Sequence, residues 1–404
     1  MSTLEEIRGN DVSAFQEAGK TFRQNIRDYG MYIALLAIVI IFTIATDGLF
    51  ISPRNIVNLV NQTGYIAVLA IGMTLVIVIR HIDLSVGFLA GFLGAVAAVG
   101  MVEYDLPVFV VIPLVLGLGI LAGLLTSFMV ANLGIPAFVA TLAGWLGYRG
   151  ALQLVTRSTG TIIIPNDAFN AIGNDFIPEL PVTIVPEYHN ATLFLGLLAI
   201  IIFLFSEITR RNRLLKQGAE VSSTGMFILK LAGISILIGG VMGILAGYRG
   251  LSWTAVVVLI VTLIYHFITT QTILGRHIYA VGGNPEAAEL SGISVKRITQ
   301  AVFGSMGMLS ALAGILFAAR LQSATTTAGT LFELDAIAAS FVGGVSAGGG
   351  VGTVIGSLIG ALVMSSLTNG MNLMGVDISY QYIVRAFVLA SAVIFDVVTR
   401  GKTE

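Results

Sequence analysis

Four titratable side chains stand beside long apolar segments of the chain, and they are the first candidates for chemistry. They form two pairs, His81 with Asp83 and Glu333 with Asp335. Ionisable groups inside a membrane often serve proton relays, so such pairs could couple transport to a proton gradient. The distribution of positive charge, however, predicts that the first pair lies near the cytoplasmic face and the second near the outer face. We therefore expect both pairs to cap helices and anchor loops.

The sequence predicts no nucleotide site on this chain. Gly19-Lys20-Thr21 resembles the end of a phosphate-binding loop, but Ala14 stands in place of the first glycine and no strand precedes it. The absence of cysteine excludes disulfides and thiolate chemistry, and no His/Asp/Glu spacing typical of a metal site stands out. We expect no catalytic residue, no metal and no cofactor bound by this chain.

Polar side chains follow one another along the apolar segment Ile56–Ile79. Asn58, Asn61, Gln62 and Tyr65 recur at helical spacings, which group them loosely on one side near one end. A polar stripe on a membrane helix faces protein or water rather than lipid. Two interpretations stay open: hydrogen bonding to neighbouring helices, or the lining of a translocation path.

These candidates belong to a chain with the composition of a polytopic membrane protein. Mean hydropathy is +0.93, 56% of the residues are hydrophobic and 11% are charged, against roughly 25% charged in soluble domains. The formal net charge is −1, so we expect no nucleic-acid partner. Apolar runs long enough to cross the lipid bilayer predict an all-α fold with about twelve transmembrane helices.

Positive charge predicts which loops lie on which side of the membrane. The segments that it places in the cytoplasm are 1–28, 270–298 and 399–404. The transmembrane region is then 29–398, and both termini are cytoplasmic. Loops 156–191 and 320–335 are expected on the periplasmic side, and 192–247 is expected to form a helical hairpin with a basic cytoplasmic turn.

The cytoplasmic loop 270–298 is the one long polar segment in the second half of the chain. Asn284-Pro285 predicts a helix start within it, since Asn caps free amides and Pro fits the first helical position. Glu286 suits the positive end of the helix dipole, and Gly292 can adopt the left-handed conformation that ends a helix. We expect a helix of about two turns, too short to span a bilayer.

This short helix carries an EAA-x3-G pattern that looks like the cytoplasmic coupling motif of ABC importer permeases. In that family such a helix seats in a cleft of an ATPase and moves with it. The pattern departs from the maltose-type branch downstream, where Val302-Phe303-Gly304-Ser305 replaces Ile-x-Leu-Pro. The residues to which the resemblance assigns ATPase coupling are Asn284, Pro285, Glu286, Ala287, Ala288 and Gly292.

Glycine recurs at every fourth residue from Gly344 to Gly360. Where this segment is helical, the glycines leave a bare groove that lets another helix approach closely. The doubled glycines near Gly343 and Gly349 predict a break or a tight turn, which could also serve a moving gate. We expect Ala336–Gly348 to be short or re-entrant.

Four other stretches are similar to the permeases of ribose, xylose and other monosaccharide ABC importers. They are His81-Ile-Asp-Leu-Ser-Val-Gly87, Leu274-Gly-Arg-His-Ile-Tyr-Ala-Val-Gly-Gly-Asn284, Thr327-Ala-Gly-Thr with Glu333-Leu-Asp-Ala-Ile-Ala-Ala339, and Asn369-Gly-Met-Asn-Leu373. The resemblance covers residues 30–155 and 250–398 and is nearest to the xylose or multiple-monosaccharide branch.

The resemblance implies a ten-span permease that works as a homodimer in the bacterial inner membrane. Its implied partners are a tandem-domain cytoplasmic ABC ATPase, which binds ATP and Mg²⁺, and a periplasmic sugar-binding protein. The departure is segment 192–247, which looks like an inserted pair of spans. We expect this hairpin at the lipid-facing periphery.

The favoured function is therefore inward transport of a monosaccharide, xylose or a related pentose or hexose, by alternating access. The residues expected to line the sugar path are Asn58, Asn61, Gln62 and Tyr65. Those expected to contact the binding protein are Gln322, Thr327, Glu333 and Asp335. The alternative is an ion-coupled secondary sugar transporter acting alone, which would need buried titratable groups near mid-membrane.

Two arginines fall inside predicted spans. Arg149 is expected to pair within the bundle. Arg385 is expected to pair or to extend toward the membrane surface, and contact with the substrate is its alternative role.

Overall fold

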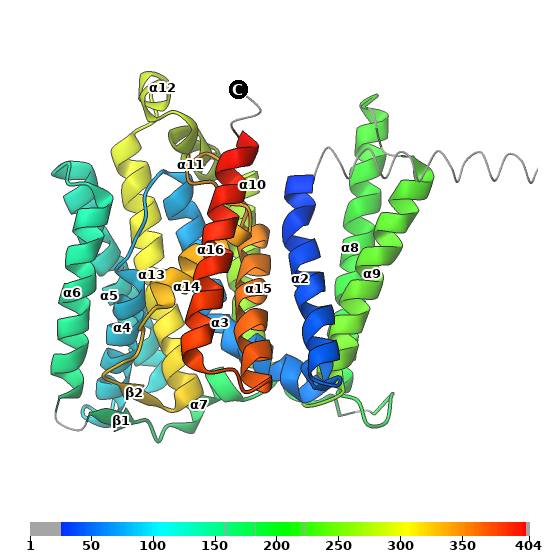
Figure 1. The fold of residues 1–404 in the computed structure, drawn as a ribbon, viewed down its shortest axis with the longest axis horizontal. Helices are drawn as coiled ribbons and strands as arrows, with labels where there is room; N and C mark the ends of the chain where they lie inside the picture. The colour runs from blue at the N-terminus through cyan, green and yellow to red at the C-terminus, as the bar shows by residue number, and fades with distance from the viewer. Residues whose placement is uncertain (1–25, 158–159, 182, 220, 222, 401–404) are drawn as a thin grey trace, which may run out of the picture. The chain divides into compact units, whose positions relative to one another are not determined.

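The chain folds almost entirely into helices. The computed structural model describes residues 26–157, 160–181, 183–219, 221 and 223–400 (Figure 1). The helices, in chain order, are α2 (Ile26–Ala45), η1 (Leu49–Ile51), α3 (Pro53–Val78), α4 (Val86–Val102), α5 (Val108–Ser127), η2 (Phe128–Asn132), α6 (Ala137–Thr156), α7 (Asp167–Asn174), α8 (Asn190–Lys216), α9 (Thr224–Ala246), α10 (Trp253–Gln271), α11 (Ile273–Gly283), α12 (Pro285–Leu290), α13 (Val295–Leu321), α14 (Phe332–Val342), α15 (Val354–Leu373) and α16 (Ile378–Arg400). The candidate phosphate loop, Gly19-Lys20-Thr21, lies outside the described residues.

The helices have the lengths and compositions of membrane spans. Within the described residues, eight helices are long and apolar enough to cross a membrane, and two shorter apolar helices, Gly30–Ala45 and Val86–Val102, accompany them. The predicted all-α polytopic class is therefore confirmed, and the chain is a multi-pass membrane protein. The count of about twelve spans and the cytoplasmic position of both termini stay predictions.

The described chain divides into two compact units, of which the first is built on Ser52–Val57 and Phe176–Leu251. Its helices α8 and α9 pack against each other in opposite directions. Gly196 faces Met242 near one end of the pair, and Glu207 and Lys230 form an ion pair of 2.7 Å near the other. Segment 192–247 thus forms a helical hairpin, whereas its status as an insertion at the periphery stays a prediction.

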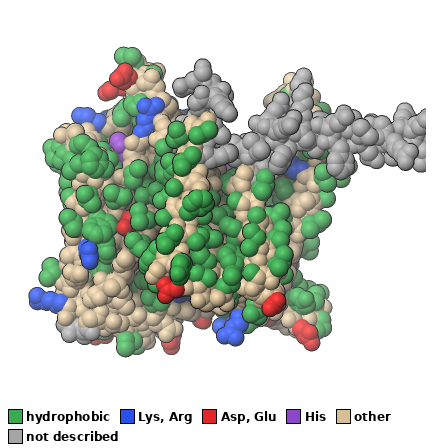
Figure 2. Space-filling model, in the orientation of Figure 1, with side chains coloured by type: hydrophobic (Ala, Val, Ile, Leu, Met, Phe, Trp, Pro, Cys, Tyr) green, Lys and Arg blue, Asp and Glu red, His purple; other side chains and the backbone are tan. Residues whose placement is uncertain are grey.

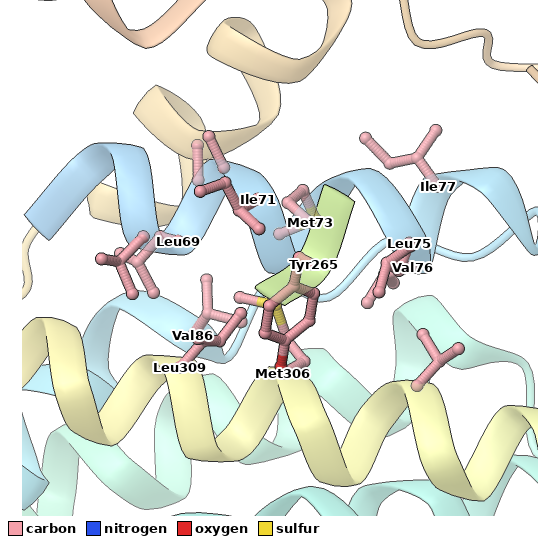
Figure 3. Packing of buried hydrophobic residues seen from close by; sticks show 14 of the residues in the cluster. Leu69, Ile71, Met73, Leu75, Val76, Ile77, Val86, Tyr265, Met306 and Leu309 are labelled. Atoms are coloured by element: carbon pink, nitrogen blue, oxygen red, sulfur yellow. The ribbon is translucent and has the colours of Figure 1, made fainter. Parts of the chain in front are cut away.

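The second unit comprises residues 31–51, 58–175 and 252–400, and α3 and α13 form its core. In their apolar windows, 83% of the α3 residues and 72% of the α13 residues are buried. Figure 3 shows Met306 and Leu309 of α13 and Tyr265 of α10 lying against side chains of α3. In lipid, such a core is held by close van der Waals contact rather than by removal from water.

The outer surface of the second unit is apolar between two polar ends. Figure 2 shows hydrophobic side chains over the middle of the visible face, with most charged side chains toward its two ends. Helix α12 and the end of α16 lie at one end, and the strands, α7 and the turn between α15 and α16 lie at the other (Figure 1). We call them the α12 end and the opposite end.

The repeated glycines near residue 350 have two different roles. Gly344 and Gly349 have φ of +87° and +79° and belong to the non-helical loop 343–353, which ends α14 after 11 residues. At about 16 Å, α14 is too short to cross a bilayer. Gly356 and Gly360 lie in α15, where an added Cβ would meet the carbonyl oxygens of α14 and of the residue after it. The predicted break is confirmed, and the predicted groove is confirmed for this second part.

A small sheet at the opposite end was not predicted. Strands β1 (Thr161–Ile163) and β2 (Ser323–Thr325) pair antiparallel, with Thr161 opposite Thr325. The sheet joins loops 156–191 and 320–335, which are far apart in the sequence. Three-residue strands carry too little alternation to be recognised from sequence.

Candidate functional site

The polar loop 270–298 contains two helices, of which only the second was predicted. Helix α11 begins at Ile273, after Thr272, whose hydroxyl accepts a hydrogen bond of 3.1 Å from the amide of Gly275. Its last two residues, Gly282 and Gly283, lead directly into the start of α12. Helix α11 therefore joins the membrane bundle to α12.

Helix α12 has the two ends that its sequence predicts. The Asn284 side chain accepts a hydrogen bond of 3.0 Å from the amide of Ala287, and Pro285 occupies the first helical position. Gly292 has a φ of +83°, and the amide of Ile293 donates to the carbonyl of Ala288 at 3.0 Å. Both ends therefore have defined hydrogen bonds, and the helix is held to six residues.

Most of α12 faces outward. Glu286, Ala287 and Glu289 are exposed, whereas Ala288 packs inward with 5% exposure. Leu290, the last residue of the helix, is 90% exposed. Sequence reasoning missed this leucine, although an apolar residue at the end of a polar helix was a visible signal. The Leu290 side chain is therefore available for contact with another protein.

Hydrogen bonds join the base of α12 to α3. Arg80 follows the end of α3, and its Nε donates to the carbonyl of Gly282 at 2.7 Å while Nη2 donates to that of Gly283. The amide of Gly350 donates to the carbonyl of Val78 at 2.9 Å. The Tyr279 hydroxyl of α11 donates to the carbonyl of Gly352 at 2.7 Å. Helix α3, α11 and loop 343–353 thus meet directly below α12.

A polar cavity lies at the opposite end of the second unit. Its volume is about 320 Å³, and its walls come from α3, from the start of α14, and from α15 and α16. By the helical rise of 1.5 Å per residue, Gln62 on α3 lies about 27 Å along the helix from Arg80. The polar and aromatic lining residues are Gln62, Tyr65, Thr330, Phe332, Asp335, Ser365, Thr368, Asn372, Gln381, Tyr382 and Arg385.

An ion pair crosses this cavity wall. The carboxylate of Asp335, in the first turn of α14, pairs with the guanidinium of Arg385 on α16, and both side chains are mostly buried. The amide nitrogen of Gln381 donates to the Asn372 side chain at 2.7 Å and to the carbonyl of Val376 at 2.9 Å. The expectation that Arg385 pairs within the bundle is confirmed, and its partner is Asp335.

The structure separates the four residues predicted to line the path. Gln62 and Tyr65 line the cavity. Asn58 is exposed and Asn61 is 5% exposed, and neither belongs to the cavity wall. The Tyr65 ring also packs against Phe332, with 4.8 Å between ring centroids. The lining of a translocation path thus stays a prediction, supported by the position of Gln62 and Tyr65 in the cavity wall.

The residues predicted to contact a binding protein fall into two groups, one exposed and one buried. Gln322 and Thr327 are exposed in segment 320–335. Asp335 is engaged with Arg385, and Glu333 is only 4% exposed. The Trp145 indole of α6 donates to Glu333 at 3.0 Å. The surface contact thus stays a prediction for Gln322 and Thr327, whereas Glu333 lies inside the bundle.

The predicted separation of the two acidic pairs is wrong. The Glu333 carboxylate contacts Gly87 in the first turn of α4, four residues after Asp83. Asp83 and Glu333 therefore both lie near the start of α4, because α4 begins only at Val86, after the loop that follows α3. The predicted loop-anchoring role holds for Asp83, which accepts from the amide and the hydroxyl of Ser85 at 2.9 and 2.6 Å, whereas α4 itself has no side-chain cap.

The Arg149 guanidinium lies near this acidic group. It is over the rings of Phe88 and Trp145, at 5.6 and 5.4 Å from their centroids. Cation–π contacts of this kind stabilise a charge inside an apolar bundle. Arg149 thus pairs within the bundle, as predicted, and its partners are the faces of two aromatic rings.

A bundle of membrane helices with a polar cavity and a protruding, capped helix has the features of a transport permease. The permease components of branched-chain amino acid transport systems match residues 55–393, and the chain belongs to this family. It is 39% identical to the xylose transport system permease protein XylH of Haemophilus influenzae, over 94% of this chain and 98% of that protein. The same identity to XylH of Escherichia coli (strain K12) covers 94% of both chains.

A second group of relatives has a different sugar in its name. The ribose import permease protein RbsC of Haemophilus influenzae is 36% identical, over 96% of this chain and 97% of that protein. These relatives confirm the predicted resemblance to monosaccharide importer permeases of the ribose and xylose type. Among solved structures, none matches the chain.

Proposed function

We propose that this chain is the membrane permease subunit of an ATP-driven importer that moves a monosaccharide, xylose or a related sugar, across the bacterial inner membrane. Family membership and the names of the xylose and ribose relatives support the transport class and the sugar. The observation that carries the coupling mechanism is α12, a capped and exposed helix tied to α3 through Arg80.

The partner at α12 is a cytoplasmic tandem-domain ABC ATPase, on which ATP and Mg²⁺ bind. A helix fixed at both ends moves as a rigid body, so displacement by the ATPase passes to the residues at its base. Gly282 and Gly283 are hydrogen-bonded to Arg80, and α3 extends from there to the cavity. Two copies of the permease and a periplasmic sugar-binding protein complete the importer.

Transport follows an alternating-access cycle. The binding protein captures the sugar and docks on the outer surface, where Gln322 and Thr327 are exposed. Tight binding within the permease is unnecessary because capture occurs before docking. ATP-driven displacement of α12 then changes which side of the membrane the path faces, while the permease itself carries out no catalysis.

Reconstitution tests the function. Proteoliposomes would contain the permease and its ATPase, with binding protein outside, and uptake of labelled D-xylose would be followed with ATP or a non-hydrolysable analogue inside. We expect uptake only with hydrolysable ATP. Uptake that follows a proton gradient and ignores ATP would overturn the proposal in favour of an ion-coupled carrier.

Leu290→Ser tests the docking helix. Removing the apolar side chain loses roughly 1.5 kcal/mol of burial in the complex, or about tenfold in Kd for the ATPase. The matched control is Leu215→Ser, at an α8 end where the leucine is 51% exposed. Equal ATPase affinity for both variants in a pull-down titration would contradict docking through α12.

A further inference from the structure

The cavity between α3, α14, α15 and α16 has the walls of a ligand site. Ligand pockets usually have volumes of roughly 300 to 1,000 Å³ and few polar groups on an apolar frame. This cavity, at about 320 Å³, lies at the small end of that range. A pentose or hexose fits within this volume.

The polar groups of the wall are suited to hydroxyl groups. Gln62, Gln381 and Asn372 have side-chain amides; the Gln381 nitrogen already donates to Asn372 and Val376, which leaves the Gln381 carbonyl oxygen and the Asn372 amide nitrogen for a ligand. Thr330, Ser365 and Thr368 contribute hydroxyls. A sugar hydroxyl both donates and accepts, so such groups can bind it without a charge on the ligand. The rings of Tyr65 and Tyr382 offer apolar faces to the C–H side of a sugar.

The charge of the wall also indicates a neutral ligand. Asp335 and Arg385 are the charged lining residues, and they pair with each other. An anion or a cation would leave one of them without its partner, which is costly in a buried site. A neutral polyol can instead bind the N–H groups and oxygen lone pairs that the ion pair leaves available.

Contacts on the other side of α14 fix the position of this pair. Glu333 and Asp335 lie two residues apart and so point to different sides of the helix. The Glu333 side chain accepts from Trp145 and contacts Gly87, which fixes the first turn of α14 against α4 and α6. Asp335 is thereby presented to the cavity from a rigid element.

From these observations we propose that the cavity is the binding site for a monosaccharide inside the permease. Gln62, Gln381 and the Asp335–Arg385 pair bind its hydroxyls, and Tyr65 packs against its C–H face. This inference rests on the proposed import function and names the substrate site for it. A zwitterion such as an amino acid would instead require the ion pair to open.

The absence of cysteine from the sequence makes a direct test possible. The permease–ATPase complex would carry Ser365→Cys in the cavity or, as control, Thr327→Cys at an exposed position of segment 320–335. Modification by a small methanethiosulfonate would be timed with D-xylose or L-leucine present. We expect D-xylose at ten times its Kd to slow modification at position 365 by about tenfold, by mass action, and not at position 327.

Each outcome of the protection experiment either supports the sugar site or overturns it. Protection by L-leucine and not by D-xylose would assign the cavity to a zwitterion and overturn the sugar site. Protection by neither, or no reaction at position 365 and at a second cavity position, Thr368→Cys, would refute a water-accessible sugar site. If D-xylose protects, adding Gln62→Leu to Ser365→Cys should abolish protection while the complex still assembles. Failure of this test in a complex that transports D-xylose would leave the proposed function standing.

Discussion

At the scale of the residue, Arg80 links the residues at the base of α12 to the end of α3. Its guanidinium donates to two adjacent carbonyls immediately before Asn284, the cap of α12. Hydrogen bonds from a charged donor contribute roughly 1.5 to 3 kcal/mol each. Any displacement of α12 is therefore transmitted to the end of α3 through the Arg80 side chain, whose length is fixed.

Arg80→Ala should reduce transport more than ATP hydrolysis. Without the side chain, α12 can move while α3 stays in place, so we expect D-xylose uptake per ATP hydrolysed to fall about tenfold. Arg157→Ala, which removes an exposed arginine from loop 156–191, is the matched control. An unchanged ratio of uptake to hydrolysis in proteoliposomes would contradict the link.

Glu179 is a second residue with a defined role, at the start of α8 in the first unit. Its carboxylate accepts hydrogen bonds from the amides of Leu180, Asn190 and Ala191 at 2.8 to 3.1 Å. Partial desolvation raises the pKa of this carboxyl, but the hydrogen bonds from the three amides and the nearby His189 together outweigh it, so the pKa is lowered from its usual value. The ionised form is thus the one that the fold stabilises.

A pKa that is lower in the folded state gives stability at neutral pH that is lost in acid. The contribution is complete above the unfolded-state pKa of about 4.3 and disappears as the pH falls through the lowered folded value. Glu179→Gln should therefore melt at a lower temperature than wild type at pH 7, with the difference vanishing in acid. Glu187→Gln, an exposed change in the same loop, should have no such effect. Equal melting temperatures of wild type and Glu179→Gln at pH 7 would refute the role.

At the scale of the element, the contact between α14 and α15 depends on glycine. A Cβ on Gly360 would overlap the carbonyl oxygen of Ala339, and backbone cannot move aside as a side chain can. Gly360→Ala should destabilise the protein by about 1 to 3 kcal/mol, the usual cost of overpacking. Gly117→Ala on α5 has open space at its Cβ and is expected to be neutral or slightly stabilising. Thermal unfolding in nanodiscs would compare the two, and similar effects would contradict close packing at Gly360.

Local sequence predicted those elements whose causes are local. The ends of α12 follow from Asn284, Pro285 and Gly292, and the break near Gly349 follows from its glycines. The partner of Arg385 could not be predicted, because Asp335 is fifty residues away and meets it only in the folded bundle. The same reason explains why the strand pair and the position of Glu333 beside Gly87 were missed.

At the scale of the whole second unit, packing density indicates which helices move together. The Thr74 and Ser357 hydroxyls hydrogen-bond between α3 and α15, and the Ser340 hydroxyl of α14 donates to the carbonyl of Ala70 at 3.2 Å. In their apolar windows, 67% of α15 is buried but only 12% of α16. We therefore expect α3, α14 and α15 to move together, whereas α16 has the smaller buried share and fewer contacts to break.

Cross-linking distinguishes the helices expected to move together from the wall expected to move. We expect a disulfide formed in Thr74→Cys with Ser357→Cys to leave ATP-driven D-xylose uptake largely intact, because it joins helices that already move as one. A short bifunctional thiol cross-linker in Ala338→Cys with Ala386→Cys should arrest uptake, since both residues line a second hollow between α14 and the weakly packed α16. The uncross-linked form of this variant, which keeps the Asp335–Arg385 ion pair, is its own reference and isolates the effect of the cross-link. Movement between helices costs least where few contacts must be broken, which is why α16 is expected to move. Arrest by the first cross-link, or undiminished uptake with the second, would show that the cavity opens elsewhere.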